Sequence, residues 1–406
     1  MFQKNELDEF YQIRQDIHAH PELKYQEFRT SKLIENYLKN LKFDEVFTGI
    51  GGTGLVGVLK GTHESKNKSI RSIGLRADMD ALPIQEENSF SHKSVNSGKM
   101  HACGHDGHVT ILLAAAKKLS ESRNFCGRVN FIFQPAEEGG AGGKAMIEDG
   151  LFENFPMDEI YALHNWPGMS AGSFGFKSGP IMASSNQFEI NIHGKGGHAA
   201  MPHLCVDPVL ISSHLIQSFQ TIASRFLDPI EPVVVSVTKI EVGETANIIS
   251  DKCNLLGTVR TFSMNVLDLV ETKMKHMCET VAKTFGGSVV FNFQRQYPPT
   301  INHPKQTEIA ISVAEKLVGK EKIDKEVKPS MGAEDFSFML QKCPGSYFFL
   351  GNGISSANRF ERENNNSHPP CMLHNSKYDF NDSLIGVGAE FWVRLIESRI
   401  GEITDD

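Results

Sequence analysis

The feature that most constrains the fold of this chain is a set of short apolar runs separated by helical patterns. The runs are RSIGLRAD (71–78), GRVNFIFQ (127–134), EIYALHN (159–165) and GSYFFLG (345–351). Runs of this kind are typical of strands that are covered on both faces. Apolar residues at three- and four-residue spacing predict helices over 6–20, 29–41 and about 107–120. The alternation predicts an α/β sheet with helices packed on it.

Residues 185–297 have a different pattern. NQFEINIHG, VVVSVTKIE, CNLLGTVRTF and GGSVVFNFQRQ predict four strands, and helices begin after Asp207 and after Ser263. Both residues are of types that cap helix N-termini. The resulting β-α-β-β-α-β order is the ferredoxin-like arrangement. We therefore predict an α/β domain formed by residues 1–184 and 298–406, with an inserted α+β domain over 185–297.

Composition narrows the class of protein. The chain has 406 residues and a net charge of −8, without a stretch rich in lysine or arginine, which argues against a nucleic-acid partner. It has no apolar run of eighteen residues and no signal-peptide pattern at its start, so we expect no membrane association. Seven scattered cysteines suggest no disulfide framework, and we expect a cytoplasmic location.

The stretch HACGHDGH (101–108) contains five groups that can bind metal. Cys103 and His105 are two residues apart, so on an extended chain their side chains point the same way. No second ligand pair follows nearby, as a structural zinc site would need. An alternative is that Cys103 is a small buried residue and that the histidines bind loop backbone.

Further candidates follow other predicted strands. Glu137 and Glu138 end FIFQPAEEGG, His164 lies in YALHNWPG, and His374 lies in CMLHNSKYDFND. Two adjacent carboxylates repel each other, and a nearby cation removes that conflict. One carboxylate can then bind metal while the other acts as a general base. Alternatively, the glutamates form a solvated turn and His164 is a core histidine. Together, Cys103, His105, Glu138, His164 and His374 would suffice for two ions.

LRADMDALP (75–83) places Asp78 and Asp80 after another strand. Asp78 is a candidate to orient a ligand imidazole from outside the ligand set. The alternative is an aspartate that caps the following turn.

These motifs resemble the M20 metallopeptidase family, in its amidohydrolase branch of hippurate hydrolases, N-acyl-amino-acid amidohydrolases and auxin-conjugate hydrolases. The resemblance runs nearly from end to end. It is carried by RQDIHAHPEL (14–23), GLRADMDALPI (74–84), MHACGHDGH (100–108), FQPAEEGGAGG (133–143), GGHAAMPH (196–203), MGAEDFS (331–337) and LHNSKYDFND (373–382). It implies an aminopeptidase-like α/β catalytic domain with two metal ions and an inserted ferredoxin-like lid domain.

The resemblance also implies a role for individual residues. Glu137 matches the general acid/base, and His198 matches a lid histidine that stabilises the oxyanion and that related enzymes supply from a neighbouring subunit. Asn247 and Arg260 match lid positions that contact the substrate. The metal ligands are matched by Cys103, which would bridge the two ions, and by His105, Glu138, His164 and His374. Each lid residue also has a structural alternative: a loop hydrogen bond for His198, a turn for Asn247 and a solvent-facing strand position for Arg260.

The predicted activity is hydrolysis of the amide bond of N-acyl amino acids, with a water activated by metal and with Glu137 as the base. A bridging thiolate favours zinc, manganese, nickel or cobalt over magnesium. A di- or carboxypeptidase with the same machinery is the near alternative, and a binding protein that has lost catalysis is the alternative from another class. The resemblance implies a homodimer or homotetramer.

Overall fold

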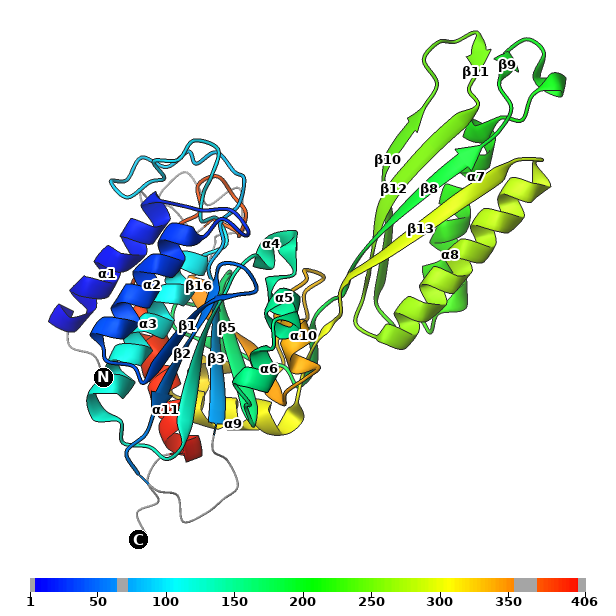
Figure 1. Ribbon diagram of the computed structural model, residues 1–406. Coiled ribbons are helices and arrows are strands. Elements are labelled where there is room, and N and C mark those ends of the chain that lie inside the picture. Colours follow the sequence, from blue (N-terminus) through cyan, green and yellow to red (C-terminus); the bar gives the residue numbers. More distant parts are fainter. Residues whose placement is uncertain (1–3, 64–71, 354–370, 401–406) are drawn as a thin grey trace. The chain divides into compact units, whose positions relative to one another are not determined.

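A computed structural model describes residues 4–63, 72–353 and 371–400. The chain divides into two compact units (Figure 1). The first contains Met1–Gly179, Ile301–Lys328 and Phe338–Asp406, and the second contains Pro180–Thr300 and Pro329–Ser337. The second unit therefore begins before residue 185, and it includes a later segment because the N–H of Ser330 donates to the carbonyl oxygen of Ile181.

The first unit contains an eight-stranded sheet in the order β1-β2-β4-β3-β5-β16-β6-β15. The inner strands β4, β3, β5 and β16 run parallel, so their carboxyl ends lie at one edge of the sheet. All residues of β3 are buried, as expected for a strand covered on both faces. The strands are β1 Glu45–Ile50, β2 Gly54–Lys60, β3 Ser72–Asp78, β4 Arg128–Gln134, β5 Glu159–Pro167, β6 Phe174–Gly175, β15 Ile323–Asp324 and β16 Gly345–Gly353.

Helices of the first unit form one core with this sheet. α3 packs against α1 and α11, and its central residues are buried together with Phe391 and Trp392 of α11. The helices are α1 Lys4–Ala19, α2 Phe28–Asn40, α3 His105–Ser122, α4 Glu137–Gly140, α5 Gly142–Glu148, α6 Leu151–Asn154, α9 Pro304–Val318, η3 Lys320–Lys322 and α11 Leu384–Ile400. The predicted helix start is about residue 107, whereas α3 begins two residues earlier, at His105. This candidate ligand therefore lies at the start of the helix.

The second unit contains an antiparallel sheet in the order β10-β12-β8-β13, with α7 and α8 packed on it. The side chain of Asp207 accepts the Val209 N–H at 2.8 Å, and that of Ser263 accepts the Val266 N–H, so both predicted caps are present. Its elements, with those at its boundary, are β7 Gly179–Met182, β8 Ser185–His193, β9 Gly197–His198, η1 Pro202–Leu204, α7 Pro208–Thr221, η2 Ile222–Phe226, β10 Val233–Val242, β11 Ile248–Ile249, β12 Lys252–Thr261, α8 Met264–Thr284, β13 Ser288–Tyr297, β14 Thr300–Asn302 and α10 Phe336–Leu340.

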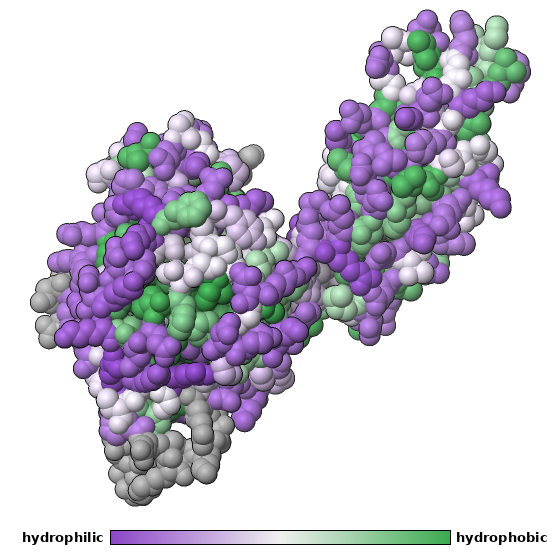
Figure 2. All heavy atoms as spheres, in the orientation of Figure 1, coloured by the Kyte–Doolittle hydropathy of each residue, from purple (hydrophilic) through white to green (hydrophobic). Residues whose placement is uncertain are grey.

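The elements of the second unit follow the predicted β-α-β-β-α-β order, β8-α7-β10-β12-α8-β13. The predicted fold class, α/β with an inserted ferredoxin-like domain, is therefore confirmed. Figure 2 shows hydrophobic residues in small groups between hydrophilic ones on the visible face of each unit. Within the described residues, none of the helices has both the length and the apolar composition needed to span a membrane.

Candidate metal centre

The candidate ligands of the first unit meet where the parallel strands end. His164 lies in β5, Glu137 and Glu138 follow β4, and His105 begins α3. The backbone N–H of His374 donates to the carbonyl oxygen of Ala102 at 2.8 Å, which places its segment beside the Cys103 loop. Active sites of open α/β sheets typically lie at this carboxyl edge.

All five predicted ligands belong to overlapping groups whose donor atoms lie within 4.8 Å of one another. The groups are Cys103, His105 and His164; Cys103, Glu138 and His374; and His105, Glu137 and Glu138. Cys103 Sγ lies 3.4 Å from His164 Nε2, and His374 Nε2 lies 3.1 Å from Glu138 Oε1. The structure thus brings together residues that are up to 271 positions apart in the sequence (103 to 374).

Hydrogen bonds fix which ring nitrogen of each histidine is free to bind metal. His105 Nδ1 lies 2.8 Å from the carbonyl oxygen of Asp80, and His164 Nδ1 lies 2.7 Å from that of Asn165. A carbonyl oxygen only accepts, so in both rings Nδ1 is the donor and Nε2 carries the lone pair when the ring is neutral. In the neutral form of each ring, Nε2 is therefore the nitrogen available to a metal ion.

His108 belongs to another cluster of potential ligands, with Asp78 and His105, yet both its ring nitrogens are occupied. Nδ1 lies 2.6 Å from Asp78 Oδ1, and Nε2 accepts the Asn165 N–H at 2.9 Å. Asp78 is fully buried and also pairs with Arg76 at 2.7 Å. Burial opposes its ionisation, but His105, Arg76 and His108 hold the pKa of Asp78 well below its usual value. The hydrogen bonds of Asp78 thus go to Arg76 and His108, and His105 Nε2 is 3.7 Å away.

Asp80, the second aspartate of LRADMDALP, also lies beside the candidate ligands, and the orienting role of Asp78 stays a prediction. Its two carboxylate oxygens accept the N–H groups of Glu137 and Glu138, at 3.0 and 2.9 Å. Its Oδ1 lies 3.3 Å from His105 Nδ1. The only sequence signal for this role is the alternation of two aspartates after a strand, which does not say which of them faces the site.

Electrostatics at the centre favour a bound cation. Burial raises the pKa of the Cys103 thiol well above its usual value, and Glu138, Glu137 and Asp78 add to this. Burial lowers the pKa of His105, but Asp78 and Asp80 outweigh it and raise the pKa to about 10. The carboxylates thus attract positive charge, and Cys103 becomes a thiolate ligand only if a cation balances them.

The donor set fits divalent metal ions of intermediate softness. His105 Nε2 is fully buried and has no hydrogen-bond partner among the described residues. Burial and the neighbouring His108 lower the pKa of His164 well below its usual value, which keeps the ring neutral. A thiol, imidazoles and a carboxylate match zinc and its neighbours in the first transition series.

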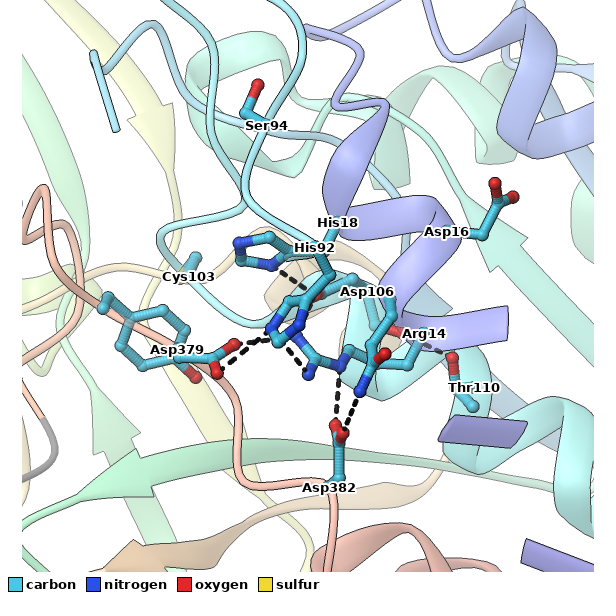
Figure 3. A network of polar contacts seen from close by, with 12 residues as sticks. Arg14, Asp16, His18, His92, Ser94, Cys103, Asp106, Thr110, Asp379 and Asp382 are labelled. Atoms are coloured by element: carbon cyan, nitrogen blue, oxygen red, sulfur yellow. Dashed lines mark hydrogen bonds and ion pairs between the residues drawn. The ribbon is translucent and has the colours of Figure 1, made fainter. Parts of the chain in front are cut away.

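Asp106 of HACGHDGH belongs to a different network, shown in Figure 3. Asp106 is fully buried and lies 2.8 Å from His18 Nδ1. Arg14, also buried, reaches Asp379 at 2.7 Å and Asp382 at 2.6 Å, on the segment that follows His374. The network thus anchors the loop of Cys103 and the segment of His374 on α1. Neither ring nitrogen of His101 has a hydrogen-bond partner among the described residues.

The predicted lid residues lie in the second unit. His198 is in β9, where it pairs with Ile248 of β11, and the carbonyl oxygen of Asn247 accepts the Ala199 N–H at 3.0 Å. Arg260 is in β12, and its Nε lies 3.2 Å from Thr258 Oγ1. Burial lowers the pKa of Arg260, and no described residue forms an ion pair with it.

An α/β sheet that gathers sulfur, nitrogen and carboxylate donors around a buried glutamate defines a hydrolase of the metal-dependent type. Residues 74–398 match the peptidase family M20/M25/M40. The chain therefore belongs to this family, as predicted, and is a hydrolase of amide bonds.

Individual relatives cover nearly the whole chain. The hippurate hydrolase of Campylobacter jejuni is 41% identical over 95% of this chain and 95% of its own length. Thermostable carboxypeptidase 1 of Saccharolobus solfataricus is 37% identical over 94% of this chain and 93% of its own length. Among solved structures, one similar protein is the YXEP protein of Bacillus subtilis, a dinuclear metal-binding peptidase of the M20 family. It is 29% identical, the match covers 98% of this chain and 99% of that chain, and the TM-score is 0.82.

Proposed function

We propose that this protein is a metal-dependent amidohydrolase that cleaves N-acyl amino acids into a carboxylic acid and a free amino acid. One observation carries the proposal: buried Glu137 lies within 4.8 Å of His105 and Glu138, in a donor set that also contains Cys103, His164 and His374. Similarity to a hippurate hydrolase supports the N-acyl substrate, since hippurate is an N-acyl amino acid.

We assign the five residues Cys103, His105, Glu138, His164 and His374 as ligands of two divalent ions, either zinc, manganese, nickel or cobalt. The dinuclear centre of the Bacillus subtilis relative supports this number. Ions bound there would supply Lewis acidity for the amide carbonyl and would make a water molecule more acidic. Asp78 would act indirectly, because its hydrogen bond orients His108 beside the candidate ligands.

Glu137 carries the proton in the proposed reaction. It takes a proton from the attacking water and returns it to the leaving nitrogen, so that one carboxylate acts first as base and then as acid. The Asp80 carboxylate holds the backbone on both sides of this residue through the N–H groups of Glu137 and Glu138. These two hydrogen bonds fix the backbone of Glu137, so its carboxylate is attached to a rigid turn.

The second unit supplies the proposed substrate contacts. Arg260 would pair with the free carboxylate of the amino-acid half, since a guanidinium binds a carboxylate through two hydrogen bonds. Arg260 has no ion-pair partner among the described residues, and its guanidinium contacts Thr258 Oγ1 through Nε, which leaves the two terminal nitrogens available. His198 would donate to the oxyanion and Asn247 would contact the substrate, in keeping with the family resemblance.

Amino-acid release from a small panel tests the proposal. Metal-stripped protein, with and without added zinc or manganese, is assayed on hippurate, N-acetylmethionine and a dipeptide with a free amine. Metal-dependent release from the two blocked substrates is the expected result. Cleavage of the dipeptide alone would instead make the protein a peptidase, the function of the Saccharolobus relative. Silence throughout with metal bound would support a non-catalytic binding protein.

We further propose a cytoplasmic homodimer or homotetramer. All seven cysteines are free, which suits a reducing compartment. Met201, Leu204 and Ile248 near His198 are exposed, and exposed apolar side chains in one region favour contact with another chain. Sedimentation analysis of the protein with and without metal gives the number of subunits.

A further inference from the structure

The segment after α1, HPELKYQE (20–27), has no role in the proposed reaction, yet it contacts the turn that carries Glu137 and Glu138. The Tyr25 hydroxyl donates to the carbonyl oxygen of Gly140 at 2.7 Å, and Lys24 Nζ donates to that of Gly139 at 3.3 Å. Glu27 Oε1 accepts the N–H of Ala136 at 2.8 Å. Residues about 110 positions apart in sequence are thus joined by three hydrogen bonds.

The turn has a conformation that its own sequence does not favour. Ala136 has a φ of 52°, Gly139 of 70° and Ala141 of 55°. Residues with a Cβ rarely adopt this left-handed region, and they persist there only when the surrounding structure holds them. Since Glu137 follows Ala136 directly, relaxation of Ala136 to an ordinary φ would redirect both glutamate side chains.

Two carboxylates hold the start of the turn. The N–H groups of Ala136, Glu137 and Glu138 follow one another in the chain, and Glu27 accepts the first while Asp80 accepts the other two. Successive N–H groups that point the same way form a concave anion site, which here is filled by the protein's own carboxylates. The N–H of Ala81 donates to the carbonyl oxygen of Glu22 at 2.8 Å, so both carboxylates belong to one connected assembly.

The contact between Glu27 and Ala136 requires a carboxylate to be buried, which costs free energy. The side chain of Glu27 is fully buried and burial raises its pKa, while the Thr53 hydroxyl and the Ala136 N–H lower it. A buried carboxylate is disfavoured unless its oxygens are hydrogen-bonded, and both are bonded here.

We propose that Glu27 and Tyr25 are positioning residues that hold the Ala136–Ala141 turn in its left-handed form, so that Glu138 faces the other metal ligands and Glu137 faces the substrate. The proposal rests on the proposed function of Glu137 and Glu138. Glu27 holds the start of the turn, and Tyr25 holds its end.

Tyr25→Phe tests the proposal most cleanly, because the ring is 38% exposed and the substitution removes only the hydroxyl. Partners of this kind typically change metal affinity or activity by about 10–100-fold. We expect Tyr25→Phe to weaken zinc affinity and lower kcat by about 10-fold, and Glu27→Ala to do so by about 100-fold, with KM nearly unchanged. Glu27→Gln, which retains an oxygen acceptor for Ala136, should recover much of the loss.

Tyr37→Phe is the matched control, because Tyr37 lies on α2 and its hydroxyl donates to Glu9 of α1 at 2.9 Å. Zinc affinity is measured by competition with a chromophoric chelator, and folding is checked by thermal melting. Unchanged zinc affinity and kcat in folded Tyr25→Phe and Glu27→Ala would overturn the proposal. If Glu27→Ala does not fold, Tyr25→Phe decides alone. If the wild-type protein cleaves no N-acyl amino acid, the proposed function fails, while zinc affinity still decides on the positioning role.

Discussion

Asp78 Oδ1 lies 2.6 Å from His108 Nδ1, next to the candidate metal ligand His105. With Nε2 accepting the Asn165 N–H, this contact leaves His108 no free nitrogen for a metal. His105, three residues earlier, has a buried Nε2 without a hydrogen-bond partner among the described residues. The two histidines of one helical turn therefore differ in whether Nε2 has a hydrogen-bond partner, and we expect them to have different tasks.

Substitution of these two histidines should separate the tasks. We expect His105→Gln to lose bound metal, because a ligand atom disappears. His108→Gln should retain the same number of ions per subunit, with affinity reduced by about 10-fold at most. Elemental analysis after dialysis against a fixed free-zinc concentration measures the ratio of metal to protein. Equal losses in both variants would mean that His108 is a ligand too.

Asp80→Asn should impair catalysis without removing a ligand. An amide has one acceptor oxygen, so one of the two N–H groups of Glu137 and Glu138 loses its carboxylate partner. We expect kcat to fall by about 10–100-fold. Asp16→Asn, on the surface beside Arg29, is a matched control that should behave like the wild type. Steady-state kinetics on hippurate distinguish the two, and a wild-type kcat for Asp80→Asn would contradict the role given to this residue.

The fold was largely predictable from local patterns, whereas the positions of site residues were not. Buried runs predicted β3, β4, β5 and β16, and Asp207 and Ser263 marked helix starts, because such signals depend on neighbouring residues. The left-handed φ of Ala136 depends on Glu27, which lies 109 positions away in the sequence, and the contacts of Asp78 depend on His108, which lies 30 positions away. No spacing rule encodes these contacts.

His18 should make stability depend on pH. Burial lowers its pKa, but Asp106 and Glu86 outweigh burial and raise the pKa to about 9, above the usual 6.5. Its contribution is therefore complete below pH 6.5 and is lost as the pH rises through 9. We expect the difference in unfolding free energy between wild type and His18→Gln to fall by ~2–4 kcal/mol from pH 6 to pH 10.

Chemical denaturation of the metal-free protein at several pH values measures this difference. His20→Gln provides a control, since His20 is partly exposed and its Nδ1 lies 2.8 Å from the carbonyl oxygen of Asp16. A difference for His18→Gln that stays constant from pH 6 to pH 10 would show that His18 is not protonated in the folded protein.

Gly104→Ala should disrupt the loop between Cys103 and His105. Gly104 has a φ of 90°, and an added Cβ would lie 2.3 Å from Asn165 Nδ2 and 2.5 Å from the Tyr378 hydroxyl. We expect a loss of about 1–3 kcal/mol in unfolding free energy together with weaker zinc binding, because the strain falls between two ligands. Gly98→Ala is the control, since its φ is 74° but its Cβ would meet nothing within 4 Å. Equal losses would assign the effect to backbone strain alone.

In the proposed reaction, Glu137 moves the proton while its neighbours hold the metal. Glu137→Gln keeps the shape of the side chain and removes its basicity, so hippurate turnover by the zinc-loaded variant, measured beside its zinc content, separates proton transfer from metal binding. We predict a wild-type number of bound ions and a kcat lower by about 10²–10⁴-fold. A variant that binds zinc fully and still turns over hippurate at the wild-type rate would show that Glu137 is not the base.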